Sequence, residues 1–337
     1  MNRYIWLGAI ACATVIVVGQ PAAAITIETV PVGDPGNPAG DRGNGAVYSV
    51  YHIGKYEVTV GQYATFLNAV AATDRYELYN PSMATDERIA GIARSGSPGR
   101  YTYDVIGSPN KPVTYVNWAD GQRFCNWLHN GQPVGLQDDA TTEDGAYALH
   151  GAHPAVAPSI SRKPDAQWVL PSVDQWYKAG HYQPAEQGGD VDGYWRYPTR
   201  SNDEPYSAEP PGNDAPDPTR TANVRGLYGD YAVPGVNRLT DVGAYEFSAG
   251  PYGTFDQAGN VLELANVGPY LYLVGGDWHN GAGITASIEV ADSITEDATR
   301  GFRIASGAIP EPDSAIVALV ACGAACSARF HPFRKRR

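Results

Sequence analysis

The chain has 337 residues, enough for one large domain or two ordinary ones, and 43% of them are hydrophobic, so a substantial core can form. Its 38 glycines and 26 prolines, with only 18% charged residues, favour a compact fold with much irregular structure over a helix bundle. The formal net charge of −12 disfavours nucleic acid and anionic membranes as partners.

The first segment expected in chain order is a secretory signal peptide over residues 1–24. Arg3 precedes an apolar run from Ile5 to Val18, and three alanines at 22–24 provide a small-residue cleavage site. Residues 25–45 are rich in Pro, Gly, Asp and Asn, which predicts an extended lead-in.

A strand and a helix are expected at the start of the folded domain. The segment from Val47 to Val58 is rich in Tyr, Val and Ile, as is typical of a strand. Thr59 is a suitable N-cap for a helix with one apolar face, formed by Tyr63, Phe66, Leu67 and Val70. Residues 73–111 carry many turn residues and indicate a long insertion.

Two further helices are predicted from their capping residues. Asn117 can cap a helix that continues to about His129 and ends at Gly131. After an irregular insertion that extends to residue 164, Ser172 and Gln175 form a capping-box sequence for a third, short helix. Residues 183–220 are dense in Pro, Gly, Asp and Glu, and predict an ordered loop region.

The stretch from Tyr252 to Arg303 is punctuated by glycines between apolar residues, which predicts turns that bring strands together. Between Gly259 and Glu263, an amide side chain, turn carbonyls and a carboxylate form an oxygen-rich set that suits Ca²⁺. The same residues also fit a plain turn in which Asn260 bonds its own backbone and Glu263 faces water. Short helices followed by glycine-punctuated strands predict an α+β domain.

The end of the chain has three parts: Pro310-Glu311-Pro312, an apolar run over residues 315–328, and a tail with five basic residues. This pattern resembles the PEP-CTERM sorting signal of Gram-negative bacteria. The resemblance implies an exosortase-type protease as a partner, transient anchoring in the inner membrane through the apolar run, and a final location in the periplasm, at the cell surface or in the extracellular matrix. Without both terminal signals, residues 25–312 carry 18 basic and 35 acidic residues, a net charge of −17.

Six motifs in order resemble the formylglycine-generating enzyme, or sulfatase-modifying factor, family. They are Tyr56-Glu57-Val58-Thr59 with its helix, Pro112 to Trp127, Leu170 to Trp176, the Gly259-Asn260-x-x-Glu263 turn, the Gly275-Gly276-x-Trp278 strand, and Gly301-Phe302-Arg303. The resemblance covers about residues 46–306. It implies one domain over 46–307 with the formylglycine-generating-enzyme fold, which is C-type-lectin-like, followed by the sorting signal over 308–337.

The resemblance implies a copper(I) site in catalytic members of the family, formed by two cysteines after the Gly-Gly strand. Aligned on Gly275 and Gly276, the two positions in this chain are Asn280 and Thr285. Copper(I) selects soft thiolates, and an amide with a hydroxyl cannot replace them. No copper is therefore expected, and no cysteine occurs between Asn126 and Val320. Cys125 is expected to be a buried structural thiol.

Calcium is the cofactor that the resemblance implies. Carried over to this chain, one set of structural Ca²⁺ ligands would be Gly259, Asn260, Val261 and Glu263. A second set would begin at Asn223 and Val224, with Asp230 as its acidic ligand.

The leading hypothesis is an exported, non-catalytic binding module for a peptide or glycan ligand. Its expected pocket consists of Asp277, Trp278, His279, Asn280 and Arg303. One alternative is an oxidoreductase of the formylglycine-generating or nonheme-iron type with altered chemistry, in which His279, Asp277 and Asn280 hold a different metal. A third alternative is a structural matrix component.

Overall fold

The computed structural model describes residues 24–267, 270–290 and 295–307. The predicted sorting signal and all of the predicted signal peptide except Ala24 lie outside these ranges. Within them, no helix has both the length and the apolar character needed to cross a bilayer.

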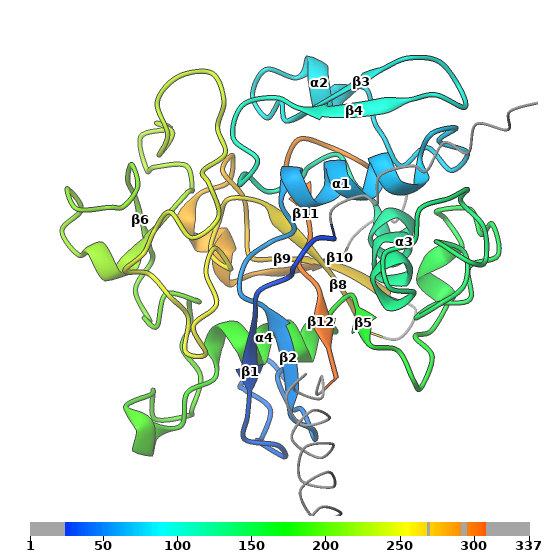
Figure 1. The fold of residues 1–337 in the computed structure, drawn as a ribbon. Helices are drawn as coiled ribbons and strands as arrows, with labels where there is room; N and C mark the ends of the chain where they lie inside the picture. Colours follow the sequence, from blue (N-terminus) through cyan, green and yellow to red (C-terminus); the bar gives the residue numbers. More distant parts are fainter. Residues whose placement is uncertain (1–23, 268–269, 291–294, 308–337) are drawn as a thin grey trace, which may run out of the picture.

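The first sheet brings together the two ends of the described domain. It contains β1 (Thr29–Val32), β2 (Tyr51–Gly54), β5 (Trp168–Val169) and β12 (Ala305–Ser306), in the order β1-β2-β12-β5. All three pairings are antiparallel. β2 is shorter than the strand predicted over residues 47–58 (Figure 1). The segment after it lies beside residues 302–304, because the Val58 N–H donates to Phe302 O and the Gly54 N–H to Ile304 O.

The second sheet contains the glycine-punctuated strands predicted late in the sequence. Its order is β10-β9-β8-β11, with the bounds β8 (Leu262–Val267), β9 (Tyr270–Val274), β10 (Ile288–Val290) and β11 (Arg300–Gly301). β8 pairs antiparallel with β9 and parallel with β11. The parallel pair places Gly301 opposite Glu263, so the Gly-Asn-x-x-Glu and Gly-Phe-Arg motifs are neighbours.

The three predicted helices are confirmed, and each begins with the expected capping contact. They are α1 (Val60–Val70), α3 (Trp118–His129) and α4 (Val173–His181), and their N-caps are Thr59, Asn117 and Ser172. In each helix the cap side chain accepts a hydrogen bond from the backbone N–H of the third helical residue, whose side chain returns to the cap backbone.

Short elements interrupt the predicted irregular regions. The insertion over 73–111 contains α2 (Ser82–Thr85) and a hairpin of β3 (Ile92–Ser95) and β4 (Thr102–Val105), which the sequence did not predict. Two-residue strands β6 (Tyr206–Ser207) and β7 (Thr221–Ala222) pair in parallel in the loop-rich part at the left of Figure 1. The 3₁₀ helices are η1 (Ala157–Ser159), η2 (Ala185–Gln187), η3 (Pro218–Arg220) and η4 (Ala282–Ala286).

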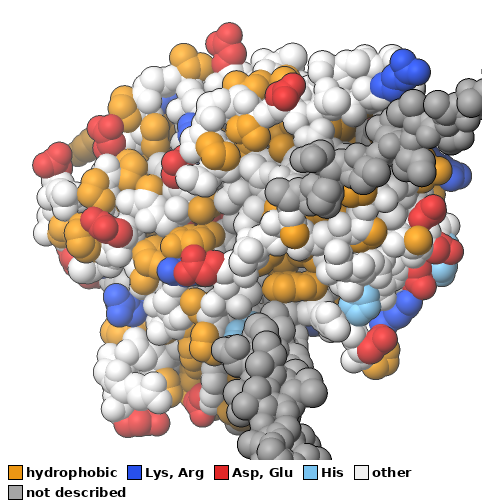
Figure 2. Space-filling view, in the orientation of Figure 1, with side chains coloured by type: hydrophobic (Ala, Val, Ile, Leu, Met, Phe, Trp, Pro, Cys, Tyr) orange, Lys and Arg blue, Asp and Glu red, His pale blue; other side chains and the backbone are white. Residues whose placement is uncertain are grey.

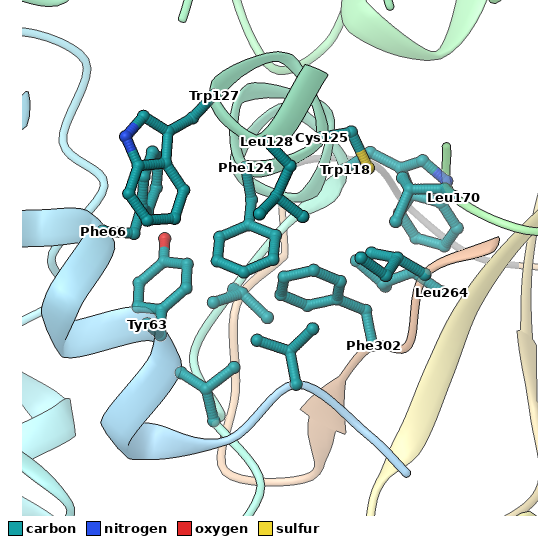
Figure 3. Close-up of a cluster of buried hydrophobic side chains, with 14 of the residues drawn as sticks. Tyr63, Phe66, Trp118, Phe124, Cys125, Trp127, Leu128, Leu170, Leu264 and Phe302 are labelled. Carbon is teal, nitrogen blue, oxygen red and sulfur yellow. The ribbon is translucent and has the colours of Figure 1, made fainter. Parts of the chain in front are cut away.

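The main core lies where α1 and α3 meet the segment around Phe302. Aromatic rings from both helices surround Phe302, whose centroid is 5.5 Å from that of Phe124 and 6.4 Å from that of Tyr63 (Figure 3). Edge-to-face pairs of this kind add to the hydrophobic stabilisation. Cys125 is fully buried at the edge of this cluster, and burial raises the pKa of its thiol, as expected for a structural cysteine.

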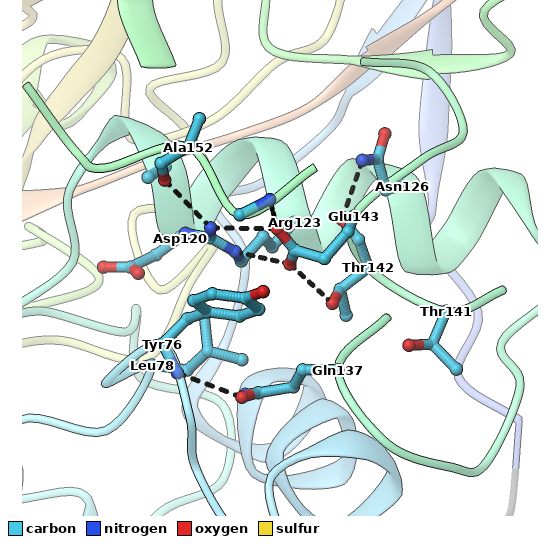
Figure 4. Close-up of polar contacts among 12 residues, drawn as sticks. Tyr76, Leu78, Asp120, Arg123, Asn126, Gln137, Thr141, Thr142, Glu143 and Ala152 are labelled. Atoms are coloured by element: carbon cyan, nitrogen blue, oxygen red, sulfur yellow. Dashed lines mark hydrogen bonds and ion pairs between the residues drawn. The ribbon is translucent and has the colours of Figure 1, made fainter. Parts of the chain in front are cut away.

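A buried ion pair holds the loop that follows α3. Arg123 donates from Nε to Glu143 Oε1 at 2.7 Å and from Nη2 to Glu143 Oε2 at 3.1 Å (Figure 4). Glu143 also accepts from Thr142 and from the Gly151 N–H, and the guanidinium lies 4.3 Å from the centre of the Tyr76 ring. The insertion is therefore part of the folded domain. The helices and sheets together confirm the predicted α+β class.

Candidate functional site

The turn that opens β8 needs a glycine for two independent reasons. Gly259 has a φ of +87°, and a Cβ on it would lie 2.4 Å from the carbonyl oxygen of Asn223. The next residue, Asn260, has a φ of +61°, which asparagine tolerates better than most residues. Its backbone N–H donates to Asn223 O at 2.9 Å, and its carbonyl accepts from Trp278 N at 3.1 Å. The turn thus joins the segments around Asn223 and Trp278.

Glu263 and Arg303 form a buried, bidentate ion pair. The distances are 2.5 Å from Arg303 Nε to Glu263 Oε2 and 2.6 Å from Nη2 to Oε1, and both side chains are fully buried. Trp176 Nε1 donates to Glu263 Oε2 at 2.9 Å. The remaining donors of the guanidinium contact the carbonyl oxygens of Gly54 and Phe255. The Arg303 side chain is therefore located in the protein interior. The prediction that it lines a ligand pocket was wrong.

These contacts do not fit a calcium ion held by the turn. Both carboxylate oxygens of Glu263 already bind a cation, and Asn260 Oδ1 accepts from Asn223 Nδ2 at 3.0 Å and from Thr240 N at 3.2 Å. A Ca²⁺ ion would need these oxygens as ligands and would sit against the Arg303 charge. In the second predicted ligand set, the Asn223 amide is buried and contacts Asn260 of the first set. Asp230 of the second set is exposed on a loop.

Two more carboxylates lie beside this ion pair. Glu57 is buried, and its Oε1 is 3.3 Å from Asn260 Nδ2. Asp256 accepts from the Gly243 N–H at 2.5 Å. Burial raises the pKa of Asp256 to about 6, and burial together with the Asp256 charge raises the pKa of Glu57 well above its usual range. The sequence contained Glu57 within a matched motif but gave no sign of this proximity.

The predicted pocket residues after β9 form a tight polar turn. Asp277 is buried, and its carboxylate accepts from the backbone N–H groups of His279 at 2.6 Å and Asn280 at 3.0 Å. Asn280 Nδ2 also donates to Asp277 Oδ2 at 2.6 Å. Burial raises the pKa of Asp277. Its oxygens orient the turn, so His279 alone among these three residues has an exposed side chain.

The two positions implied for the copper site hold side chains with local structural partners. The Asn280 amide caps Asp277, as above, and Thr285 Oγ1 donates to Ala282 O at 2.7 Å within η4. Thr285 is buried against Gly276, where a Cβ would lie 3.1 Å from its methyl group. Neither residue offers a soft anionic donor, so the residues present do not fit copper(I).

A group of aromatic and basic side chains lies between the buried Trp278 and the surface. We term it the Tyr231 cluster, and its members are Tyr231, Arg225, Arg238, Trp278 and His279. Trp278 is buried and donates from Nε1 to Ala298 O at 3.2 Å. The Tyr231 ring lies 5.7 Å from the Trp278 ring, and its hydroxyl is 3.4 Å from His279 Nδ1. Of the cluster, only Trp278 and His279 were among the predicted pocket residues.

An open groove of about 560 Å³ adjoins the cluster. Its walls are residues 204–207, the loop 225–228 with Asp230, and residues 281–283. Arg225 belongs to both features: its backbone N–H donates to Asn280 O at 2.9 Å, and its side chain reaches Tyr231. The groove therefore begins directly beside Asn280, the first of the two positions implied for the copper site.

Comparison with known proteins was made against families, curated proteins and solved structures. A family model described as the sulfatase-modifying factor enzyme 1-like domain matches residues 38–307. No curated protein gives a significant match. The crystal structure of CarF is similar in fold, with 18% identity and a TM-score of 0.52 over 85% of this chain and 100% of that chain.

Two other solved structures show weaker similarity. The Treponema denticola variable protein 1 has 16% identity and a TM-score of 0.47, covering 86% of this chain and 98% of that chain. PvdO from Pseudomonas aeruginosa has 16% identity and a TM-score of 0.43, covering 83% and 92%. At such identities the likeness to CarF bears on the fold alone.

Proposed function

The chain belongs to the sulfatase-modifying factor enzyme 1-like family, and within it we propose that this protein is a binding module without the oxidase chemistry of the family. One observation carries the proposal. Asn280 and Thr285 stand at the positions implied for the thiolate pair, and each is engaged in a local hydrogen bond. An open groove with aromatic and charged walls begins beside them, and such concave surfaces are the usual sites of ligand binding.

Export and sorting are part of the same proposal. The signal peptide at residues 1–24 and the Pro-Glu-Pro, apolar and basic segments of 308–337 support it. An exosortase-type protease would release the domain from the inner membrane to the periplasm, the cell surface or the matrix. Mass spectrometry of the exported protein tests this: a mature form that keeps its basic tail would contradict sorting.

Oxygen consumption tests the absence of oxidase chemistry. The purified protein is incubated with copper(I), oxygen and a cysteine-containing sulfatase peptide. Neither formylglycine nor oxygen uptake above that of the protein-free mixture is expected, because free copper(I) and thiols react with oxygen by themselves. The double variant N280C/T285C is the matched comparison, because it introduces the two missing sulfur donors. Turnover by the parent protein, lost on changing Asn280 or Thr285, would overturn the proposal.

Metal analysis and a ligand screen separate the alternatives. Stoichiometric iron, copper or zinc retained after chelation and re-addition would favour the altered oxidoreductase. Asp277 argues against that reading, because its oxygens accept three hydrogen bonds from its own turn. A binding module should give saturable binding in a glycan and peptide screen, and a purely structural component should give none.

A further inference from the structure

Two arginines of the Tyr231 cluster lack an acidic partner within the part of the chain that the structure describes, although the protein has a net charge of −12. The Arg238 guanidinium lies 4.1 Å from the centre of the Tyr231 ring, and the Arg225 guanidinium lies 5.5 Å from it. Among the described residues neither forms a salt bridge. The other described arginines without a salt bridge are all exposed, whereas these two are half-buried; the exposed ones are Arg42, Arg75, Arg100, Arg162, Arg196 and Arg200. Acidic side chains occur in several places on the face shown in Figure 2, so carboxylates that could pair with arginine are common at the surface.

The backbone around these arginines holds them in place. Arg225 forms isolated β-bridges with Tyr231 and with Gly281, and its Nε donates to Gly229 O at 3.1 Å. Arg238 Nη1 donates to Val233 O at 3.0 Å. Both side chains are half-buried, which weakens the screening of their charge by water. Fixed, partly desolvated guanidinium groups lose little entropy when an anion binds.

The groove beside the arginines has a different character. Glu204 and Asp230 line it together with Tyr206 and Tyr228, and Tyr228 is 98% exposed. The opposite wall contains Gly281, where a Cβ would meet nothing within 4 Å. The site therefore combines a cationic end, exposed aromatic faces, and carboxylates that can accept hydroxyl protons.

We propose that the Tyr231 cluster and the groove bind an acidic polysaccharide in which uronates are separated by neutral sugars, with a uronate carboxylate at the cationic end formed by Arg225 and Arg238 and neighbouring neutral rings in the groove. The planar guanidinium suits a planar carboxylate, because two parallel N–H groups can bind its two oxygens. Sugar hydroxyls can donate to Glu204 and Asp230, and sugar faces can stack on Tyr228. An acidic peptide fits less well, because its further carboxylates would face those two acids.

This inference names the ligand class of the proposed binding function and rests on it. Titration calorimetry tests it directly, with a short oligosaccharide of neutral sugars that carries a single uronate as the ligand. Saturable binding is expected that weakens as salt rises. R225A/R238A should weaken it at least tenfold, while R75A should leave it unchanged. Arg75 is the matched control because it is exposed and lies over Tyr76 at 5.3 Å in a different cleft.

A conservative pair guards against a folding defect. R225K/R238K keeps both charges but removes the planar fork, so it should bind with intermediate affinity and retain the thermal transition of the parent. Affinity equal to that of the parent would show that the arginines do not bind a carboxylate in the proposed geometry, and would overturn this part of the inference.

Three other probes decide the ligand class. A neutral cellohexaose and a poly-glutamate peptide should bind at least tenfold more weakly than the uronate oligosaccharide. The methyl ester of that oligosaccharide should also bind at least tenfold more weakly, because esterification removes the carboxylate charge. Preference for poly-glutamate or the neutral sugar would overturn the inference while leaving a binding module intact. Oxygen turnover, in contrast, would refute the proposed function itself.

Discussion

Two settings of arginine in the described structure can be compared: paired with a carboxylate in the core, and half-buried without such a partner beside the groove. Arg303 is fully buried and binds both oxygens of Glu263. Arg225 and Arg238 are half-buried, lie near the Tyr231 ring and have no salt-bridge partner among the described residues. A buried charge must be neutralised locally because desolvation is costly. Arg225 and Arg238 are half-buried, so their charges do not need a local carboxylate. Both guanidinium groups can therefore bind an anionic ligand.

The ion pair of Arg123 and Glu143 follows the rule of the core setting. Both side chains are buried, and the carboxylate has further donors in Thr142 and Gly151. Removing arginine should therefore destabilise the protein at positions 303 and 123, and should affect only binding at 225 and 238.

The largest effect is expected for Arg303→Ala. It leaves Glu263 without its cation, next to the buried acids Glu57 and Asp256, and should cost about 3–5 kcal/mol of unfolding free energy. Chemical denaturation measures the loss. Arg225→Ala, as the surface counterpart, should change stability by no more than about 0.5 kcal/mol. A loss below about 1 kcal/mol for Arg303→Ala would contradict the distinction between the two settings.

Arg123→Met should cost about 3 kcal/mol, because Glu143 would stay buried without its partner. Replacing both residues by apolar ones, as in R123M/E143L, should recover at least half of this loss, since no charge is then buried. The comparison by denaturant unfolding isolates the cost of the unpaired carboxylate. If the double variant were less stable than the single one, packing and not charge would dominate this site.

A smaller and opposite effect is expected for Asp256→Asn. Burial raises the pKa of Asp256 from 3.8 to about 6, so its contribution to stability is complete below about pH 4 and is lost as the pH rises through 6. Asparagine cannot ionise and tolerates the φ of +59° at this position. The variant should be more stable by on the order of 2 kcal/mol at pH 7.5.

The pH profile provides the control for Asp256→Asn. At pH 4, where the parent carboxyl is protonated in the fold, the two proteins should melt at nearly the same temperature. A gain in stability that is equal at pH 4 and pH 7.5 would show that ionisation of Asp256 is not its cause.

Local signals in the sequence predicted local structure well. Thr59 with Gln62 and Ser172 with Gln175 identified the starts of α1 and α4, because a capping box is complete within four residues. The family match over residues 38–307 and the α+β class also agree with the motifs. The exact extent of β2 could not be predicted, because strand length depends on partners such as β12 from the other end of the chain.

Long-range polar contacts could not be predicted from spacing. Glu263 and Arg303 both stood in recognised motifs, yet they were assigned to a calcium site and to a ligand pocket, because nothing in either motif indicates that they bind each other across 40 positions. Arg225 and Arg238 gave no signal at all. They become informative only when both guanidinium groups are seen near the Tyr231 ring without an acidic partner among the described residues.

The smallest expected effect is that of calcium on the melting temperature. It tests whether Arg303 by itself neutralises Glu263 in the core. Because Arg303 already neutralises Glu263, removal of Ca²⁺ by a chelator should shift the melting temperature by less than about 1 °C, whereas a stabilising ion in excess would raise it by mass action. Asp230→Ala separates the two predicted ligand sets. A calcium-dependent rise that disappears in this variant would support the set of Asn223, Val224 and Asp230. A calcium-dependent rise in melting temperature that persists in Asp230→Ala would place the ion at the Glu263 turn. There the ion would have to displace Arg303, so the pairing of Arg303 with Glu263 alone would no longer describe the core.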